Sequence, residues 1–237
     1  MLAALRAGKH VFCEKPLCLT LAELAEVEAE ALARPKQQLM VGFNRRFSPL
    51  VVKMKSLLEA IDVPKNLVIT VNAGEIPADH WTQDPNVGGG RIIGEGCHFI
   101  DLIRFLVDAE ITSFNALALG EHPAVSTNND KVSILLGFSD GSVGVVNYLA
   151  NGHKAVAKER LEVFAGGRVL QLDNFLTLKG YGWDKFKKKR LWSQDKGNEA
   201  CAAAFITAVK AGALPVIPLS EVLEVSRVAM EIESSLR

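Results

Sequence analysis

The sequence carries no net charge and little cysteine. Its 237 residues include 27 Lys and Arg against 27 Asp and Glu, and only four cysteines. Binding to nucleic-acid phosphates requires a clustered excess of Lys and Arg, so this balance argues against nucleic acid as the main partner. The cysteines form no C-x-x-C pair and no Cys/His cluster with zinc spacing. This favours reduced thiols in a cytoplasmic protein and gives no candidate metal ligands.

Long apolar runs are missing as well. No stretch approaches the roughly 20 apolar residues that a membrane-spanning helix needs. The first residues also lack a secretory apolar core followed by a cleavage site, so we expect no membrane partner. Hydrophobic residues make up 49% of the chain and charged residues 23%, an ordinary globular composition that argues against disorder.

The first part of the chain alternates helices with short apolar strands. Apolar spacing predicts helices and strands over residues 2–7 (helix), 10–13 (strand), 20–33 (helix), 39–43 (strand) and 48–61 (helix). Thr20 with Glu23 forms a capping box that opens the second helix. This order is typical of the end of a doubly wound α/β unit, so we expect residues 1–63 to be the remnant of such a unit.

The rest of the chain predicts a large, mainly antiparallel sheet with helices on one face. Expected strands cover 67–71, 131–138, 142–149, 160–165, 168–172, 175–178 and 190–192, and expected helices cover 92–107, 199–211 and 220–236. Asp140-Gly141 and Gly166-Gly167 are two-residue hairpin signals. The whole chain is therefore predicted to be an α+β fold.

Both faces of this sheet are expected to carry apolar side chains. The strand over 131–138 places on one face Val132, Ile134, Leu136 and Phe138. Leu135 and the pair Val145 and Val146 add apolar groups that a single face cannot hold. Large exposed apolar patches usually mark contacts, so we expect the second face to form the interface of a homodimer or tetramer.

Two short motifs carry residues that can do chemistry. Glu14-Lys15-Pro16 ends the first strand, where open α/β sheets bind ligands, although a solvated turn is the alternative. The Lys15–Pro16 bond could be cis. Glu95, His98 and Asp101 stand three residues apart and share a helix face. Flanking carboxylates would orient and tune a histidine that acts as a general base, whereas a single helical histidine is more often structural.

Three longer motifs stand in register along the chain. They are A-G-K-H-V-F-C-E-K-P-L over 7–17, G-F-N-R-R-F over 42–47 and G-G-G-R-I-I-G-E-G-C-H-F-I-D over 88–101. Their order and spacing resemble the glucose–fructose oxidoreductase/inositol dehydrogenase (Gfo/Idh/MocA) family, and the resemblance covers essentially the whole chain. The third motif is most similar to the half found in large bi-domain oxidoreductases of polysaccharide clusters.

The resemblance implies an NAD(P)-dependent oxidoreductase that transfers hydride at a hydroxyl or carbonyl carbon of a sugar, cyclitol or sugar nucleotide. Lys15 would sit beside the nicotinamide and the reacting carbon, and His98 would be the acid–base group for the substrate hydroxyl. Family members commonly carry Asp four residues before this histidine, where this chain has Gly94. Glu95 is adjacent to that position and could replace the missing carboxylate in the proton relay.

The resemblance also assigns binding residues to both ligands. Expected cofactor contacts are Glu14, Lys15, Pro16, Asn44, Arg45 and Trp81, and expected substrate contacts are Lys15, Asp84, His98, Asp101 and Asn129. Several have structural alternatives: a loop anchor for Trp81 and Asp84, an ion pair for Asn44 and Arg45, and a turn over 128–130. The basic run over 185–190 is a solvated hairpin or, alternatively, a site for an anionic ligand such as a nucleotide-sugar diphosphate.

The family's G-x-G-x-x-G loop, which holds the pyrophosphate at a helix N-terminus, is not found in this sequence. We therefore expect residues 1–63 to be a truncated dinucleotide-binding (Rossmann) domain and residues 64–237 a substrate-binding and oligomerisation domain. Affinity of this chain alone for NAD or NADP should be lost or severely weakened, and the chain alone should be inactive. The alternative function is a cofactor-free dimerisation and ligand-binding module.

Overall fold

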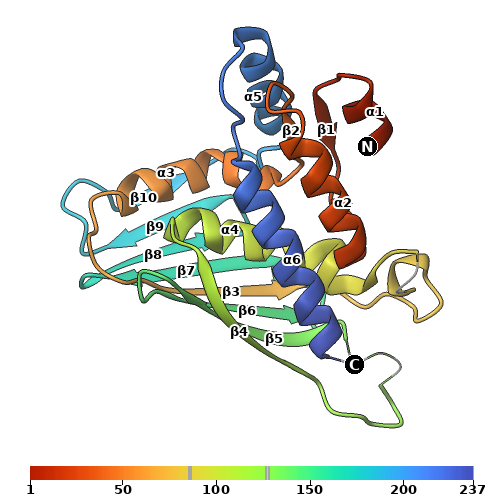
Figure 1. The fold of residues 1–237 in the computed structure, drawn as a ribbon. Helices are drawn as coiled ribbons and strands as arrows, with labels where there is room; N and C mark the ends of the chain where they lie inside the picture. The colour runs from red at the N-terminus through yellow and green to blue at the C-terminus, as the bar shows by residue number, and fades with distance from the viewer. Residues whose placement is uncertain (85–86, 126, 128, 237) are drawn as a thin grey trace.

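The structure is a computed structural model that describes residues 1–84, 87–125, 127 and 129–236. It contains a small parallel sheet, β1 (Val11–Cys13) beside β2 (Leu39–Val41), next to a much larger sheet (Figure 1). Three helices flank the small sheet and the turn that follows it: α1 (Leu2–Arg6), α2 (Leu21–Leu32) and α3 (Pro49–Leu58). The predicted capping box is confirmed, because the Thr20 side chain accepts from the Glu23 backbone and the Glu23 side chain from Thr20.

The large sheet has eight strands in the order β10-β9-β8-β7-β3-β6-β5-β4. Its strands are β3 (Asn66–Asn72), β4 (Ile111–Ala118), β5 (Lys131–Phe138), β6 (Val143–Leu149), β7 (Glu159–Ala165), β8 (Arg168–Asp173), β9 (Thr177–Tyr181) and β10 (Lys188–Arg190). β3 and β6 run parallel, and the other neighbouring pairs run antiparallel. The prediction of an α+β fold is confirmed.

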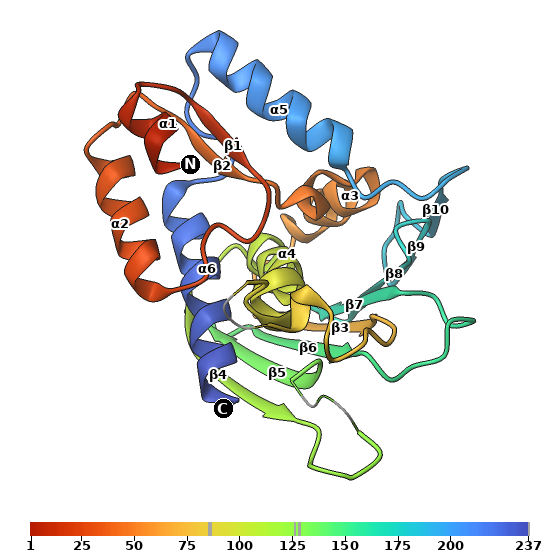
Figure 2. The same ribbon diagram turned by 90° about the vertical axis from the view of Figure 1, so that its right-hand side faces the viewer.

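Helices cover one face of the large sheet. α4 (Cys97–Val107) lies directly on it, and α6 (Leu219–Ser235) crosses α4 toward α2 (Figures 1 and 2). α5 (Asn198–Ala211) packs against η1 (Asn44–Phe47), a 3₁₀ turn that follows β2. α4 is buried around almost its whole circumference, as expected of a helix enclosed between a sheet and other helices. No helix in the described part of the chain is long and apolar enough to cross a membrane.

The alternation along β5 divides buried from exposed side chains as expected. The buried face contains Val132, Ile134, Leu136 and Phe138. Leu135 is 48% exposed on the opposite face, and Val145 beside it is half-buried. The open face therefore carries apolar side chains that no described helix covers.

β4 is an element that the sequence analysis did not predict. It is the edge strand of the large sheet, and none of its eight residues is fully buried. An edge strand without buried side chains has only a weak alternation of apolar and polar residues, which explains the omission.

All four cysteines are free thiols.

Candidate active site

Lys15 reaches from the small sheet to the helix layer. Glu14, Lys15 and Pro16 follow the carboxyl end of β1, and the Lys15–Pro16 bond is cis. The Lys15 amine donates a hydrogen bond of 2.6 Å to the Gly94 carbonyl, 79 residues further along the chain. Glu14 itself is exposed. The lysine therefore lies where the two halves of the fold meet.

The partner of Lys15 belongs to a π-helical turn, η3 (Ile92–Gly96), which leads directly into α4. Such turns are frequent at functional sites because their wider ring frees carbonyl groups and re-aims side chains. Gly94 stands four residues before His98, in the position where the resemblance expects an aspartate. The lysine thus bonds to a backbone carbonyl at the point where a carboxylate was expected.

His98 lies in the first turn of α4 with only 6% of its surface exposed. Its ring packs edge-on against Phe43, with centroids 6.2 Å apart, and its Nδ1 bonds to no described residue. Burial, together with the positive charges of Arg45 and Lys15, lowers the pKa of His98 well below its ordinary value. The imidazole is therefore neutral at pH 7.

Glu95 is held by three donors. Its Oε1 accepts from the Lys158 amine at 2.6 Å, and its Oε2 accepts from the Tyr148 hydroxyl and from Arg91, both at 2.7 Å. Burial acts to raise the pKa of Glu95, but the bonds from Lys158 and Tyr148 outweigh it and lower the value to about 2. No hydrogen bond joins Glu95 to His98 within the described residues, so the geometry gives the predicted relay no support.

Asp101, predicted to contact substrate, is fully buried in an ion pair with Arg46. Both of its oxygens accept from Arg46, at 2.6 to 2.9 Å, and Arg46 also donates to Glu221 at 2.5 Å. Arg46 of η1 thus links α4, through Asp101, to α6, through Glu221. Burial raises the pKa of Asp101 to about 6 in spite of Arg46, so the carboxylate is still ionised at pH 7.

Arg45 and Asn44 also have structural partners. Arg45 donates to both oxygens of Glu159, at 2.8 and 3.3 Å, and Glu159 accepts a further bond of 2.9 Å from Lys196. The Asn44 amide donates to the Lys196 carbonyl at 2.8 Å. Both side chains are buried, so the ion-pair alternative for Arg45 describes what is observed, and neither side chain is open to a cofactor.

A cleft of about 210 Å³ opens beside Lys15. It is lined by Lys15, Pro16, Leu19, Trp81, Thr82, Val87, Gly88, Gly90, Arg91, Gly94 and Glu95. Trp81 forms part of its rim and is 61% exposed. A Cβ on Gly88 would lie 2.6 Å from the Thr82 backbone, and Gly90 has a φ of +80°, so glycine is required at both positions in the backbone that lines the cleft.

The remaining predicted residues, Asp84 and Asn129, lie near this loop. Asp84 is exposed, and its backbone carbonyl accepts from the amides of Gly88 and Gly89. Asn129 is half-buried next to Asp130, which binds Gln83 of the same loop. Asn128 lies outside the described residues.

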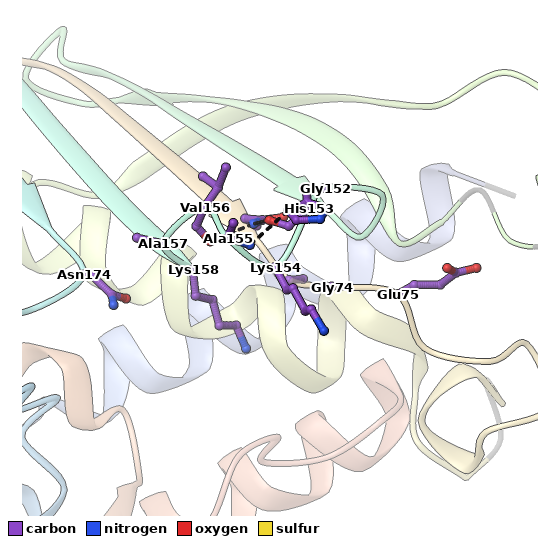
Figure 3. A pocket seen from close by; sticks show the side chains of 12 residues that line it. Gly74, Glu75, Gly152, His153, Lys154, Ala155, Val156, Ala157, Lys158 and Asn174 are labelled. Atoms are coloured by element: carbon purple, nitrogen blue, oxygen red, sulfur yellow. Dashed lines mark hydrogen bonds between the residues drawn. The ribbon is translucent and has the colours of Figure 1, made fainter.

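A second, larger cavity of about 750 Å³ was not foreseen from the sequence (Figure 3). It is lined by residues 72–75, residues 152–158 and Asn174. Lys158 belongs to its lining and bonds to Glu95 of the smaller cleft, so one ion pair joins the two cavities. Isolated lysines in a loop have no spacing that marks them as ligand-binding, so no pattern in the sequence could have singled them out.

Comparisons with known proteins agree with this architecture. Residues 54–166 match the model of the GFO/IDH/MocA C-terminal domain, and residues 1–43 match that of the oxidoreductase family with an NAD-binding Rossmann fold. The uncharacterized oxidoreductase YrbE of Bacillus subtilis is 32% identical over 72% of this chain. Myo-inositol 2-dehydrogenase of Thermotoga maritima is 30% identical over 73% of it.

The chain spans about half the length of these relatives, since the matched parts cover 50% and 52% of them. Among solved structures, an oxidoreductase domain protein of Kribbella flavida superposes with a TM-score of 0.80 over 99% of this chain and 74% of its own. Its sequence identity is 24%, so this likeness concerns the fold alone.

Proposed function

The chain belongs to the Gfo/Idh/MocA oxidoreductase family, and from this premise we propose that it forms the catalytic and substrate-binding part of an NAD(P)-dependent sugar-type oxidoreductase. The reaction would be hydride transfer at a hydroxyl or carbonyl carbon of a sugar, cyclitol or sugar nucleotide. The observation that carries the proposal is that Lys15 bonds to Gly94 in the π-helical turn that leads directly into α4. The first turn of α4 carries His98, whose Nδ1 bonds to no described residue.

Each of the two side chains has a role that its surroundings favour. The Lys15 amine can donate to the substrate oxygen and stabilise the negative charge that develops on it. His98 can accept the hydroxyl proton at Nδ1, to which no described residue is hydrogen-bonded. The nicotinamide, when bound, supplies the hydride acceptor or donor, while the protein provides position and electrostatics.

The residues present fit the nicotinamide end of a dinucleotide. The cleft opens at the carboxyl end of β1, the edge at which open α/β sheets bind such ligands. Glycines line the cleft at Gly88, Gly90 and Gly94, which lets a flat ring approach the backbone. Lys15, Pro16 and Trp81 would hold that ring. None of the 237 residues forms a G-x-G-x-x-G cradle for the pyrophosphate.

His98→Asn in the full-length protein tests the proposed base. We expect turnover to fall by roughly 10²–10⁴-fold with a small change in KM, because the proton acceptor is lost while binding contacts remain. Turnover is followed by the absorbance of the reduced nicotinamide. His122→Asn, an exposed histidine outside both cavities, is the matched control and should keep wild-type turnover. Unchanged turnover in the His98 variant would remove this residue from the mechanism.

The absence of the glycine-rich loop favours a second candidate, a ligand-binding and dimerisation module without activity by itself. Titrating NADH fluorescence with the 237-residue chain separates the two. We expect no saturation at micromolar protein, because the pyrophosphate would have no helix N-terminus to bind. Saturable micromolar binding would show that the chain holds the dinucleotide without such a loop.

Two further proposals concern the roles of the two parts of the chain and its assembly into an oligomer. We propose that residues 1–63 serve the nicotinamide side and residues 64–237 serve substrate binding and assembly. The assembly would be a homodimer or tetramer formed through the open sheet face, where five apolar side chains are exposed: Leu117, Leu135, Val143, Phe164 and Tyr181.

A further inference from the structure

The charges that act on His98 are cations: Arg45, Lys15, Lys196 and Lys158. Two carboxylates there each accept from two cations: Glu95 from Arg91 and Lys158, and Glu159 from Arg45 and Lys196. Lys15, whose amine bonds to the Gly94 carbonyl, adds a further cation, and no ion pair among the described residues joins it to an acid. The chain as a whole has equal numbers of acidic and basic residues, so this excess is local.

Lys158 stands at the boundary between the two cavities. Its amine bonds to Glu95 of the smaller cleft, while its side chain remains 38% exposed and lines the larger cavity. Lys154 lies in the same lining and bonds to no described residue. Figure 3 shows both lysines extending from one loop in the same direction, while Glu75, the acidic residue of that lining, extends to the side.

The loop that presents these lysines is held in a defined shape. The Asn72 amide donates to the carbonyls of His153 and Val156, at 2.9 and 3.0 Å, and the Asn72 backbone N–H donates to the Lys158 carbonyl at 2.7 Å. A Cβ on Gly152 would lie 1.9 Å from the Asn72 side-chain oxygen, so the loop passes close to this anchor. The two lysines therefore start from a positioned backbone, which lowers the entropic cost of binding.

We propose that Lys154 and Lys158 form a subsite for an anionic oxygen group of the substrate, a carboxylate or a phosphate, while the reacting carbon lies at Lys15 and His98. The inference rests on the proposed function and adds the substrate's charge to it. A neutral sugar would leave the local positive charge uncompensated, whereas an anion offsets it and receives charge-assisted hydrogen bonds from both amines. Burial is the main cause of the low pKa of His98, and the charges of Arg45, Lys15, Lys196 and Lys158 lower it further.

The basic strand β10 offers a competing place for an anion. Lys188, Lys189 and Arg190 are exposed, but they line neither of the cavities described above. A lysine of this strand is therefore the matched control for a lysine of the cavity.

Isothermal titration of the full-length protein with four probes tests the subsite. The probes are glucuronate, glucose 6-phosphate, inorganic phosphate and neutral glucose. We expect glucuronate or glucose 6-phosphate to bind about tenfold or more tightly than glucose. The tighter of the two identifies the anion as carboxylate or phosphate, and comparison with inorganic phosphate shows whether the sugar ring contributes.

Lysine variants test whether the preference for anionic sugars depends on Lys154 and Lys158. Lys158→Met and Lys154→Met should each lower the affinity for the preferred anion about tenfold, and Lys158→Arg should retain most of it. Lys188→Met should leave it unchanged. Should Lys158→Met lower the thermal stability, Lys154→Met still provides the test, because Lys154 is exposed and bonds to no described residue.

Two results would overturn the subsite: anionic sugars that bind no tighter than glucose, or Met variants that keep the wild-type preference. If only Lys188→Met lost the preference, the anion would bind at β10, and the proposed subsite would be wrong. Hydride transfer on neutral sugars without any anion preference would leave the proposed function standing. Anion binding at this loop with no hydride transfer to any probe would leave the subsite standing and remove the proposed function.

Discussion

Glu95 joins side chains from three different parts of the candidate site. It receives Lys158 from the loop before β7, Tyr148 from β6 and Arg91 from the turn before η3. These contacts hold its carboxylate ionised and fix the position of Lys158 between the two cavities. We therefore expect Glu95 to act by positioning Lys158.

Glu95→Gln tests this arrangement through the pH dependence of stability. The pKa of Glu95 is about 2 in the folded chain against an ordinary 4.5. The carboxylate therefore stabilises the folded state above pH 4.5, and this contribution is lost as the pH falls toward 2. The difference in pKa corresponds to stabilisation on the order of 3 kcal/mol. Urea unfolding should show a gap between wild type and variant at pH 7 that narrows below pH 4.5; a constant gap would contradict the assignment.

The histidine's neighbours show the limit of reasoning from spacing. The spacing predicted that Glu95, His98 and Asp101 share a helix face. Glu95 lies in the π-helical turn η3 and the other two in α4, and the spacing did not predict the partners of the two acids. Those partners come from elsewhere in the chain: Arg46 lies 55 residues before Asp101, and Lys158 lies 63 residues after Glu95. Tertiary packing decides such pairings, because a carboxylate removed from water takes whichever cation the fold brings to it.

At the scale of elements, the predicted helix over 92–107 consists of two parts. Its first turn is the π-helix η3 and its remainder is α4. Apolar spacing cannot separate one wide turn from an α-helical one over five residues. The turn matters because its Gly94 carbonyl binds Lys15.

The side chain of Asn72 holds the loop before β7, residues 152–158, in position. Asn72→Ala removes two hydrogen bonds, to the carbonyls of His153 and Val156. We expect a loss of about 1–3 kcal/mol in the free energy of unfolding and faster amide exchange over residues 153–158. Hydrogen–deuterium exchange read by mass spectrometry measures this, with the exposed Asn151→Ala as control. Equal protection of the loop in wild type and Asn72→Ala would refute its anchoring role.

At the scale of the whole molecule, the large sheet is covered by helices on one side and carries exposed apolar side chains on the other. Leu135 lies on the open face between β4 and β6, with Val145 opposite it on β6. Exposed apolar side chains on an open sheet face favour association with a second copy.

Leu135→Lys tests that association. A charge at the centre of an apolar interface should convert the predicted dimer or tetramer to monomer, because the ammonium group would lose its hydration without gaining a partner. Static light scattering of the purified protein measures the mass. Leu214→Lys, 87% exposed in the loop between α5 and α6, is the control. A wild-type protein that is monomeric at micromolar concentration would defeat the interface.

The sequence by itself determined the α+β class, the order of nearly all the elements, the capping box at Thr20 and the family, because these depend on local periodicity and on motifs contiguous in the chain. It also singled out Lys15 and His98. Only the tertiary structure decided that Asp101 and Arg45 serve in buried ion pairs, that Lys15 bonds to a carbonyl, and that Lys158 joins two cavities. These contacts link residues far apart in sequence, and their energies depend on burial and on the surrounding charges, neither of which a one-dimensional pattern contains.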